Sequence, residues 1–385
     1  MGITIPKISQ KVGEIMLKRI LRLALALFVA VLVLAVGFIV TLQIFEYRPA
    51  DIETLEVSEN LGDIPTDRVA LETEIKILTF NTGYASLSAT EDFVMDGGKK
   101  GRMDSQEEVE ANILGISQIL TAAAADVYLL QEVDVDSDRS YNTRQYDTYS
   151  DLLGMPSTLG YNYRCLFVPF PFQIGQMMGA VDSGIMTATG FFVSSAERYQ
   201  LPGSFSWPLR LANLKRCMTV TKLAISGSDK FLVIVNVHLS AYDDGTMRIH
   251  EMEALRDLAL QEYADGNYVV IGGDFNQTFP DGMIGDDYKY PLKDPNYWEA
   301  FEMDAQWVYD NGWSFGVDTG VDHPTCRLLN QPYDSLHREN NQYYMIDGFI
   351  VSPNVEIVGS AQVINQDFLY SDHNPVTVTI ILSED

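Results

Sequence analysis

The chain has 385 residues, enough for one large domain or two small ones, and its apolar content of 46% is ordinary for a globular protein. Its charge is divided unevenly: residues 1–48 hold six basic and two acidic side chains, whereas the rest holds 20 basic and 51 acidic ones, a net charge of −31. Such an acidic surface repels polyanions, so we expect no stable nucleic-acid partner.

Residues 23–42 form an uncharged segment rich in Leu, Val and Ala. As a helix rising ~1.5 Å per residue, it would span the ~30 Å hydrocarbon core of a bilayer. Basic residues precede it, at Lys7, Lys11, Lys18, Arg19 and Arg22. By the positive-inside rule we predict a basic cytoplasmic N-terminus (1–22), a transmembrane helix (23–42) and an extracytoplasmic remainder, in a single-pass protein of the cell membrane.

Two other interpretations of this segment stay open. A cleaved signal peptide has a shorter apolar core of ~7–15 residues and a small-x-small cleavage site. Residues 43–47, where the chain leaves the segment, lack such a site. A buried core helix is the third interpretation, and we favour the uncleaved anchor.

Residues 43–73 are acidic and show no clear period, which predicts a tether between the membrane helix and a folded domain at 74–385. The domain is expected to begin with a strand at 75–80 that ends at Asn81. Three cysteines lie far apart in the chain without C-x-x-C spacing, so a zinc site is disfavoured and we expect buried free thiols.

Two further segments have the pattern of amphipathic helices. In 105–124, Ser105 and Glu108 fit a capping box and apolar residues recur on one face; the second segment is 246–264. Apolar runs typical of strands lie at 126–130, 183–193, 218–225, 231–237, 268–271, 344–351, 355–364 and 376–382. Residues 277–343 show no regular period and are expected to be rich in loops. This order predicts a mixed α/β or α+β domain with sheets packed between helices.

Four polar strings follow apolar runs of the strand type. They are Gln131-Glu132-Val133-Asp134, Asn236-Val237-His238-Leu239, Gly272-Gly273-Asp274-Phe275-Asn276 and Ser371-Asp372-His373-Asn374-Pro375. Strand ends can aim such side chains at one point. An oxygen-rich cluster with histidines is what a hard cation such as Mg²⁺ needs for phosphoester hydrolysis.

Each string alone is weak evidence. Glu132 could be a solvated strand end, His238 a satisfied half-buried histidine, and the residues around Asp274 a turn, because Gly and Asp favour turns. The prediction of a site therefore depends on all the strings occurring together, in one order, each at a strand end.

The strings resemble the endonuclease/exonuclease/phosphatase superfamily, which includes pancreatic-type deoxyribonucleases, inositol polyphosphate 5-phosphatases and neutral sphingomyelinases. The resemblance covers residues 74–383 and includes the strand end at Asn81 and Met345-Ile346-Asp347. It implies a four-layer α/β sandwich, in which two packed mixed β-sheets are flanked by helices and the active site lies at one end of the sheets.

The resemblance also implies roles for individual residues. The implied Mg²⁺ ligands, with Mn²⁺ as the alternative ion, are Glu132, Asn81 and Asp372, the last as a second ligand or a supporting group. Asp274 would position or deprotonate the attacking water, and Asn276 would donate to a phosphoryl oxygen. His373, oriented by Asp347, would face the phosphate as a base or as a stabiliser of the transition state, and His238 would protonate the leaving group or hold a phosphate oxygen.

Three arginines are candidate phosphate contacts, with salt bridging as the favoured alternative: Arg139, Arg216 and Arg327. The chain departs from a common family pattern at Met345, where a basic residue often stands.

The implied function is a membrane-anchored, extracytoplasmic, Mg²⁺-dependent phosphoesterase, which attacks lipid headgroups or small phosphate esters with an in-line water. The alternative is an extracellular nuclease for DNA or RNA, which the acidic surface disfavours. A catalytically inactive binding domain is the third possibility.

Overall fold

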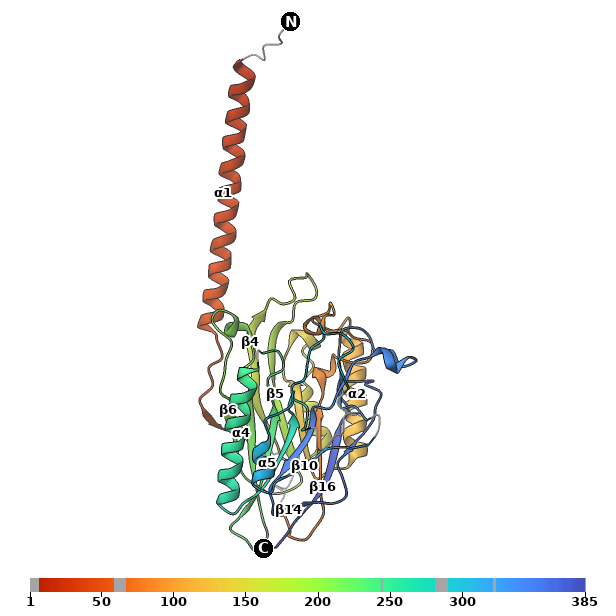
Figure 1. Cartoon of the computed structure of the whole chain (residues 1–385). Helices are drawn as coiled ribbons and strands as arrows, with labels where there is room; N and C mark the ends of the chain where they lie inside the picture. The colour runs from red at the N-terminus through yellow and green to blue at the C-terminus, as the bar shows by residue number, and fades with distance from the viewer. Residues whose placement is uncertain (1–6, 59–66, 244, 281–289, 321–322, 385) are drawn as a thin grey trace. The chain divides into compact units, whose positions relative to one another are not determined.

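The computed structural model describes residues 7–58, 67–243, 245–280, 290–320 and 323–384, with side chains from residue 13 onward (Figure 1). The chain divides into two compact units, residues 1–46 and residues 47–385.

In the first unit, residues 7–44 form the helix α1 (Lys7–Ile44), which is longer than the predicted 23–42. The sequence has no proline between 7 and 44, so nothing ends the helix before the apolar run begins. Within it, Gly13–Ile44 is long and apolar enough to cross a membrane, as a single-pass anchor or a signal sequence would.

The described residues of the second unit form two mixed seven-stranded sheets, which we call sheet A and sheet B. Sheet A has the order β1 (Ile52–Thr54), β6 (Val193–Gln200), β7 (Cys217–Ala224), β8 (Phe231–His238), β9 (Tyr268–Asp274), β13 (Asp347–Val351) and β10 (Ser314–Gly316). Sheet B has the order β14 (Val355–Ile357), β16 (Val376–Leu382), β2 (Ile75–Asn81), β3 (Val127–Asp134), β5 (Gly179–Thr189) and β4 (Ser157–Val168), and β15 (Gln362–Val363) pairs with β16. The pairs β2–β3 and β8–β9 are parallel, and the other pairs are antiparallel.

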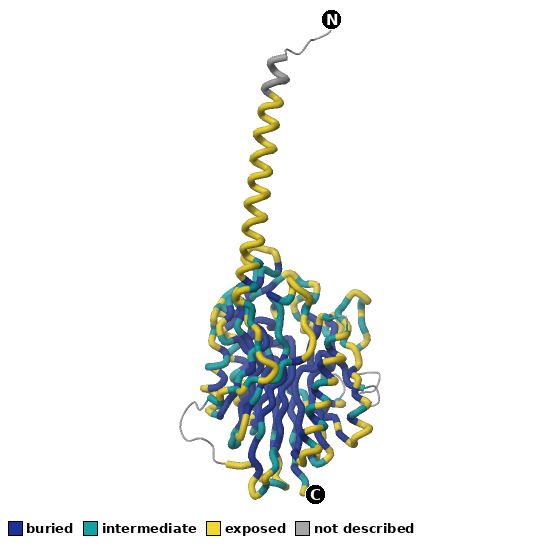
Figure 2. Tube along the Cα trace, turned by 90° about the vertical axis from the view of Figure 1, so that its left-hand side faces the viewer, coloured by how far each residue is buried: buried dark blue, intermediate teal, exposed yellow. Residues whose placement is uncertain are grey.

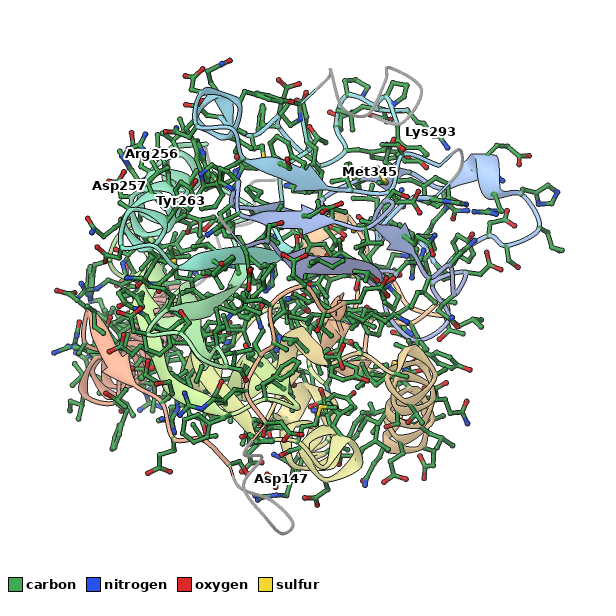
Figure 3. The ribbon with its side chains drawn as sticks, turned by 90° about the horizontal axis from the view of Figure 1, so that it is seen from below. Asp147, Arg256, Asp257, Tyr263, Lys293 and Met345 are labelled. Carbon is green, nitrogen blue, oxygen red and sulfur yellow. The ribbon has the colours of Figure 1, made fainter. Side chains whose placement is uncertain are left out.

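Helices cover the outer faces of both sheets. The longer ones are α2 (Gln106–Ala123), α3 (Gln145–Leu153) and α4 (Thr246–Ala264), and a short α5 (Gln306–Asp310) and the hairpin of β11 (Cys326–Arg327) and β12 (Tyr343–Tyr344) complete the domain. Viewed from below, Arg256 and Asp257 of α4 and Asp147 of α3 lie at opposite margins of the domain (Figure 3).

Three apolar cores separate these layers. Val127 and Leu129 of sheet B pack with Leu232 and Ile234 of sheet A in the central core. A second core joins sheet A to α4, and a third joins sheet B to α2. The strands are accordingly buried at the centre of the domain (Figure 2). The expected four-layer α/β sandwich is confirmed.

Several local predictions are confirmed. Ser105 caps α2, with its Oγ accepting from Glu108 N at 3.3 Å. The helix predicted at 246–264 and the strand predicted at 376–382 have the predicted bounds. All three thiols are free, Cys217 and Cys326 being buried and Cys165 half-buried.

The predicted tether at 43–73 differs from the structure. Ile52–Thr54 form β1, whose residues pair with Glu197–Tyr199 of β6, and further on Val69 pairs with Ile225. Residues 47–58 and 67–73 of this acidic segment therefore belong to the domain, whereas residues 43–46 belong to the first unit. Backbone pairing to an open sheet edge needs no apolar pattern. Residues 59–66 lie outside the described residues.

Candidate active site

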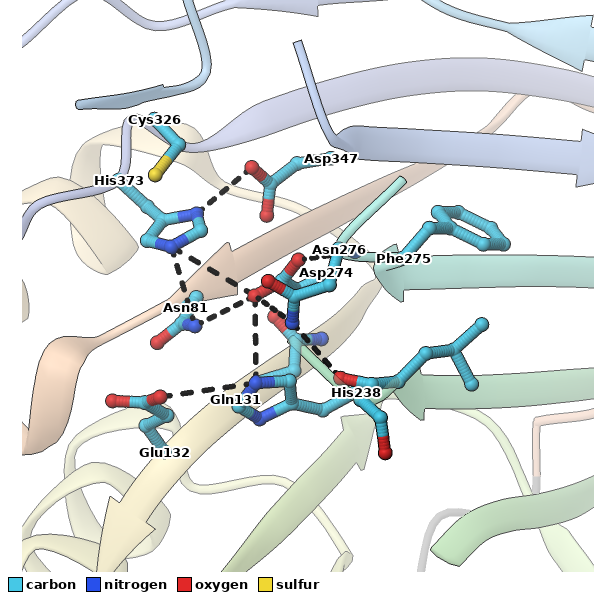
Figure 4. Close-up of polar contacts among 12 residues, drawn as sticks. Asn81, Gln131, Glu132, His238, Asp274, Phe275, Asn276, Cys326, Asp347 and His373 are labelled. Atoms are coloured by element: carbon cyan, nitrogen blue, oxygen red, sulfur yellow. Dashed lines mark hydrogen bonds and ion pairs between the residues drawn. The ribbon is translucent and has the colours of Figure 1, made fainter. Parts of the chain in front are cut away.

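The predicted site residues all lie at one edge of the two sheets, which we call the catalytic edge (Figure 4). Because β2 and β3 are parallel, as are β8 and β9, the C-terminal ends of these strands meet there. The antiparallel strands β13 and β16 begin at the same edge. The side chains delivered are Asn81, Glu132, His238, Asp274, Asn276, Asp347, Asp372 and His373.

Asp274 is the centre of this cluster. Its Oδ2 accepts a hydrogen bond from Asn81 Nδ2 at 3.0 Å, and it lies 3.5 Å from His238 Nε2 and 3.7 Å from His373 Nε2. Burial, with the neighbouring carboxylate of Asp347 second, raises the pKa of Asp274 to about 6. A carboxylate with this pKa can exchange a proton near neutral pH.

Asn276 is held beside Asp274 by its own hydrogen bonds. Its backbone N–H donates to Asp274 Oδ1 at 2.9 Å, and its Nδ2 donates to Leu239 O at 2.9 Å and to Asp274 Oδ2 at 3.3 Å. The amide hydrogens therefore already have partners. The predicted donation to a phosphoryl oxygen requires one of these bonds to be exchanged.

The two histidines of the cluster differ in charge. His373 Nδ1 lies 2.8 Å from Asp347 Oδ2. Burial lowers the pKa of His373, but Asp347 leads a group of anionic neighbours that raise this pKa well above its usual value. Burial, with Arg216 second, lowers the pKa of His238 well below its usual value. His373 is therefore the cationic imidazole and His238 the neutral one.

Glu132 reaches the site from a bulge in β3. The pairing of β3 with β5 shifts register between Leu130 and Val133, and Glu132 has a φ of 55°. A positive φ is costly for a residue with a Cβ, and such strain is typical of functional positions. Glu132 Oε1 lies 3.8 Å from His238 Nε2, whereas its buried Oε2 has no hydrogen-bond partner among the described residues.

The chemistry of the donor set fits a divalent cation. Burial raises the pKa of Glu132 and raises that of Asp372 to about 7, so these carboxylates resist ionisation without a compensating charge. A cation held by Glu132, Asp372 and Asn81 would supply that charge. Asn81 Oδ1 accepts from Gly83 N at 3.0 Å and retains a second lone pair.

Two other groups of ligand atoms lie close together at this edge. Within each group the ligand atoms lie within 4.8 Å of one another, and the groups are Asp274, Asp347 and His373, and Cys326, Asp372 and His373. Neither group contains Glu132. Geometry alone therefore does not select the predicted ligands. Among the described residues, a buried carboxylate oxygen without a hydrogen-bond partner occurs at Glu132 (Oε2) and also at Asp347 (Oδ1), and we retain Glu132 as the predicted ligand.

Sequence reasoning missed a buried polar bridge beneath the site. Gln131 Nε2 of sheet B donates to Asn236 Oδ1 of sheet A at 2.8 Å, and Asn236 Nδ2 donates to Met186 O at 2.9 Å. Both side chains are fully buried. They precede Glu132 and His238 in the same polar strings of the sequence, so these strings also contain the two residues whose hydrogen bond joins the sheets.

Two of the three arginines are occupied elsewhere. Arg139 forms a buried bidentate salt bridge with Asp134, at 3.2 and 2.8 Å, and lies 3.6 Å over the Tyr84 ring. Arg327 donates to the backbone oxygens of Ser88 and of nearby loop residues. Both guanidinium groups therefore hold the scaffold, which for Arg139 agrees with the favoured alternative of salt bridging.

The structure also places the third arginine, Arg216, and the departure from the family pattern at Met345. Arg216 Nη1 donates to His238 O at 3.3 Å, which places this cation next to the site. Met345, labelled in Figure 3, is buried in the core between sheet A and α4, where a charged side chain would be costly.

The sequence and the fold agree on one family. A model described as the Endonuclease/Exonuclease/phosphatase family matches residues 109–373, more than half of the chain, so the chain belongs to this family. The family comprises, in general, metal-dependent hydrolases that act on phosphate esters. No curated protein matches the sequence significantly.

Solved structures support the same fold. An endonuclease/exonuclease/phosphatase from Beutenbergia cavernae DSM 12333 is 16% identical with a TM-score of 0.52, over 80% of this chain and 72% of the other. A conserved protein of unknown function from Enterococcus faecalis V583 is 14% identical with a TM-score of 0.51, over 80% of this chain and 100% of the other. At this identity the likeness concerns the fold alone.

Proposed function

We propose that this protein is a membrane-anchored, extracytoplasmic phosphoesterase that depends on Mg²⁺, with Mn²⁺ as the alternative ion, and hydrolyses phosphodiester or phosphomonoester bonds. The observation that carries the proposal is the buried cluster in which Asp274 Oδ2 faces His238 at 3.5 Å and His373 at 3.7 Å, beside a carboxylate oxygen of Glu132 without a protein partner.

The protonation states of Asp274, His373 and His238 suggest a different catalytic role for each side chain. Asp274 would orient a water for in-line attack and accept its proton, which its raised pKa favours. His373, kept cationic by Asp347, would stabilise negative charge on the phosphoryl group. Neutral His238 would hold a phosphate oxygen or assist the leaving group. The bound cation would supply Lewis-acid stabilisation of the phosphoryl oxygens.

The membrane location is supported by α1. Its segment Gly13–Ile44 has the length and composition of a span, and the basic residues on its N-terminal side favour a cytoplasmic N-terminus. The net charge of −31 beyond residue 48 favours lipid headgroups or small phosphate esters over nucleic acids as substrates.

The test is a hydrolysis panel with the full chain in detergent. Phospholipids, sphingomyelin, bis-p-nitrophenyl phosphate, plasmid DNA and RNA are each incubated with Mg²⁺, with and without EDTA. Glu132→Gln is the site variant, and Glu107→Gln, an exposed carboxylate on α2, is the matched control. We expect EDTA-sensitive hydrolysis of a lipid or small ester that Glu132→Gln lacks and Glu107→Gln retains. Cleavage of nucleic acid alone would favour the nuclease, and no cleavage of anything would favour a binding domain.

A further inference from the structure

Two long turns project from the catalytic edge, and we call them the tip loops: residues 169–178 between β4 and β5, and residues 201–216 between β6 and β7. Ser183 near the start of β5 pairs with Asp134, which lies two residues from Glu132. Met218 at the start of β7 pairs with Val237, the neighbour of His238. Strand register therefore fixes both tip loops at the edge that carries the site, opposite β14 (Figure 1).

The tip loops expose large apolar side chains. Phe172 is 86% exposed and Ile174 is 95% exposed in the first loop, and Leu209 is 61% exposed beside Trp207 in the second. Scattered apolar side chains on a surface are ordinary, but groups of them at the ends of neighbouring turns mark a binding surface.

The tip loops lack the negative charge that is typical of the rest of the domain. Residues 165–181 carry no charged side chain. Residues 199–228 carry no Asp or Glu and include Arg210, Lys215 and Arg216, in a chain whose net charge is −27. Loops with apolar ends, basic residues nearer the sheets and no carboxylates suit the interface of a bilayer with anionic headgroups. The rest of the domain, which is acidic, would be repelled by such headgroups.

The chain also enters the domain at this edge. Ile52 of β1 pairs with Tyr199, next to the last residue of β6, and the Tyr47 ring lies 5.5 Å from the Arg164 guanidinium and 5.9 Å from that of Arg198. Only residues 45 and 46 separate the last residue of α1 from Tyr47.

We propose that the tip loops insert into the interfacial layer of the bilayer that holds α1, so that the catalytic edge faces the headgroups and the substrate is a phosphate ester carried by a membrane lipid. The substrate part rests on the proposed function, whereas the docking of the tip loops does not. The exposed apolar tips, the missing carboxylates and the entry of the chain are independent features that converge on one surface.

The docking is tested with the full chain reconstituted in lipid nanodiscs that contain brominated phosphatidylcholine, which quenches tryptophan fluorescence on contact. Ile174→Trp places a reporter on the first tip loop. Leu152→Trp, at a 43% exposed position on α3 near the opposite edge, is the matched control. We expect the added fluorescence of Ile174→Trp to be quenched about threefold more strongly than that of Leu152→Trp. Equal quenching of the two reporters would overturn the docking.

A second arm tests the substrate class in the same nanodiscs. The triple variant Phe172→Ser/Ile174→Ser/Leu209→Ser should hydrolyse a lipid ester about tenfold more slowly than the unmodified chain but hydrolyse soluble bis-p-nitrophenyl phosphate at the same rate. An equal loss on both substrates would overturn the proposed role of the tips. Quenching without hydrolysis of either substrate would contradict the proposed function and support the docking surface. Self-association of the chain through the tips, abolished in the triple variant, would assign the surface to a second copy and overturn the proposal.

Discussion

Replacing Asn236 by alanine should destabilise the domain, because this side chain joins the two sheets directly beneath the site. Asn236 Oδ1 accepts from Gln131 Nε2 at 2.8 Å, and Asn236 Nδ2 donates to Met186 O at 2.9 Å, all in the fully buried interior. Each such bond is worth about 1 kcal/mol net. The buried Met186 O loses its bond from Asn236, whereas Gln131 Nε2 keeps its bonds to Thr79 Oγ1 and Leu129 O. We expect the free energy of unfolding to fall by about 2–4 kcal/mol.

The assay is urea unfolding of the full chain in mild detergent, followed by tryptophan fluorescence. Thr221→Val is the matched control: Thr221 Oγ1 lies in the neighbouring strand, buried and without a hydrogen-bond partner among the described residues, so its removal should be nearly neutral. The double variant Gln131→Leu/Asn236→Leu should cost less than the sum of the single variants, because both polar partners leave together. A loss below about 0.5 kcal/mol for Asn236→Ala would refute the reasoning.

Three further predictions concern the site and the topology. Arg139→Met should lower the free energy of unfolding by about 3–5 kcal/mol, because it leaves the fully buried Asp134 carboxylate unpaired; an unchanged urea midpoint would contradict this. Glu132→Gln, Asp274→Asn and His373→Ala should each reduce hydrolysis by about 10²-fold or more while the chain stays folded by circular dichroism, and full activity in any one of them would remove that residue from the site. A C-terminal epitope tag should be digested by protease added outside intact cells while an N-terminal tag survives, and the reverse pattern would invert the orientation.

The sequence predicted those elements in which local pattern and burial agree. The helix at 246–264 and the strand at 376–382 have the predicted bounds. Asn81, Glu132, His238 and Asp274 lie at the C-terminal ends of strands, as predicted. Asp347 instead begins β13, and Asp372 and His373 precede β16. The parallel pairs then bring residues that are distant in the sequence to one edge, which a family resemblance could anticipate but a local pattern could not.

The missed elements share one physical feature: their local apolar period is absent or interrupted, so packing or strand pairing, rather than a local pattern, holds them in place. The buried residues of α3 are Gln145, Tyr149 and Ser150, so the sequence of this helix has no apolar period from which it could be predicted. β1 exists through its pairing with β6, far along the chain. β4 interrupts its apolar residues with Gly160 and Arg164, and it too depends on its pairing with β5. Polar interior contacts are satisfied by tertiary partners, which local periodicity does not reveal.

The most direct test of the central claim is Mn²⁺ binding to the full chain, followed by the loss of the free-ion electron paramagnetic resonance signal, because this measurement needs no knowledge of the substrate. If Glu132 and its neighbours hold the cation, the unmodified chain should bind Mn²⁺ saturably, Mg²⁺ should displace it, and Glu132→Gln should bind about tenfold or more weakly while Glu107→Gln binds normally. Equal binding by Glu132→Gln, or no saturable binding by the unmodified chain, would contradict the assignment of this edge as a metal-dependent active site.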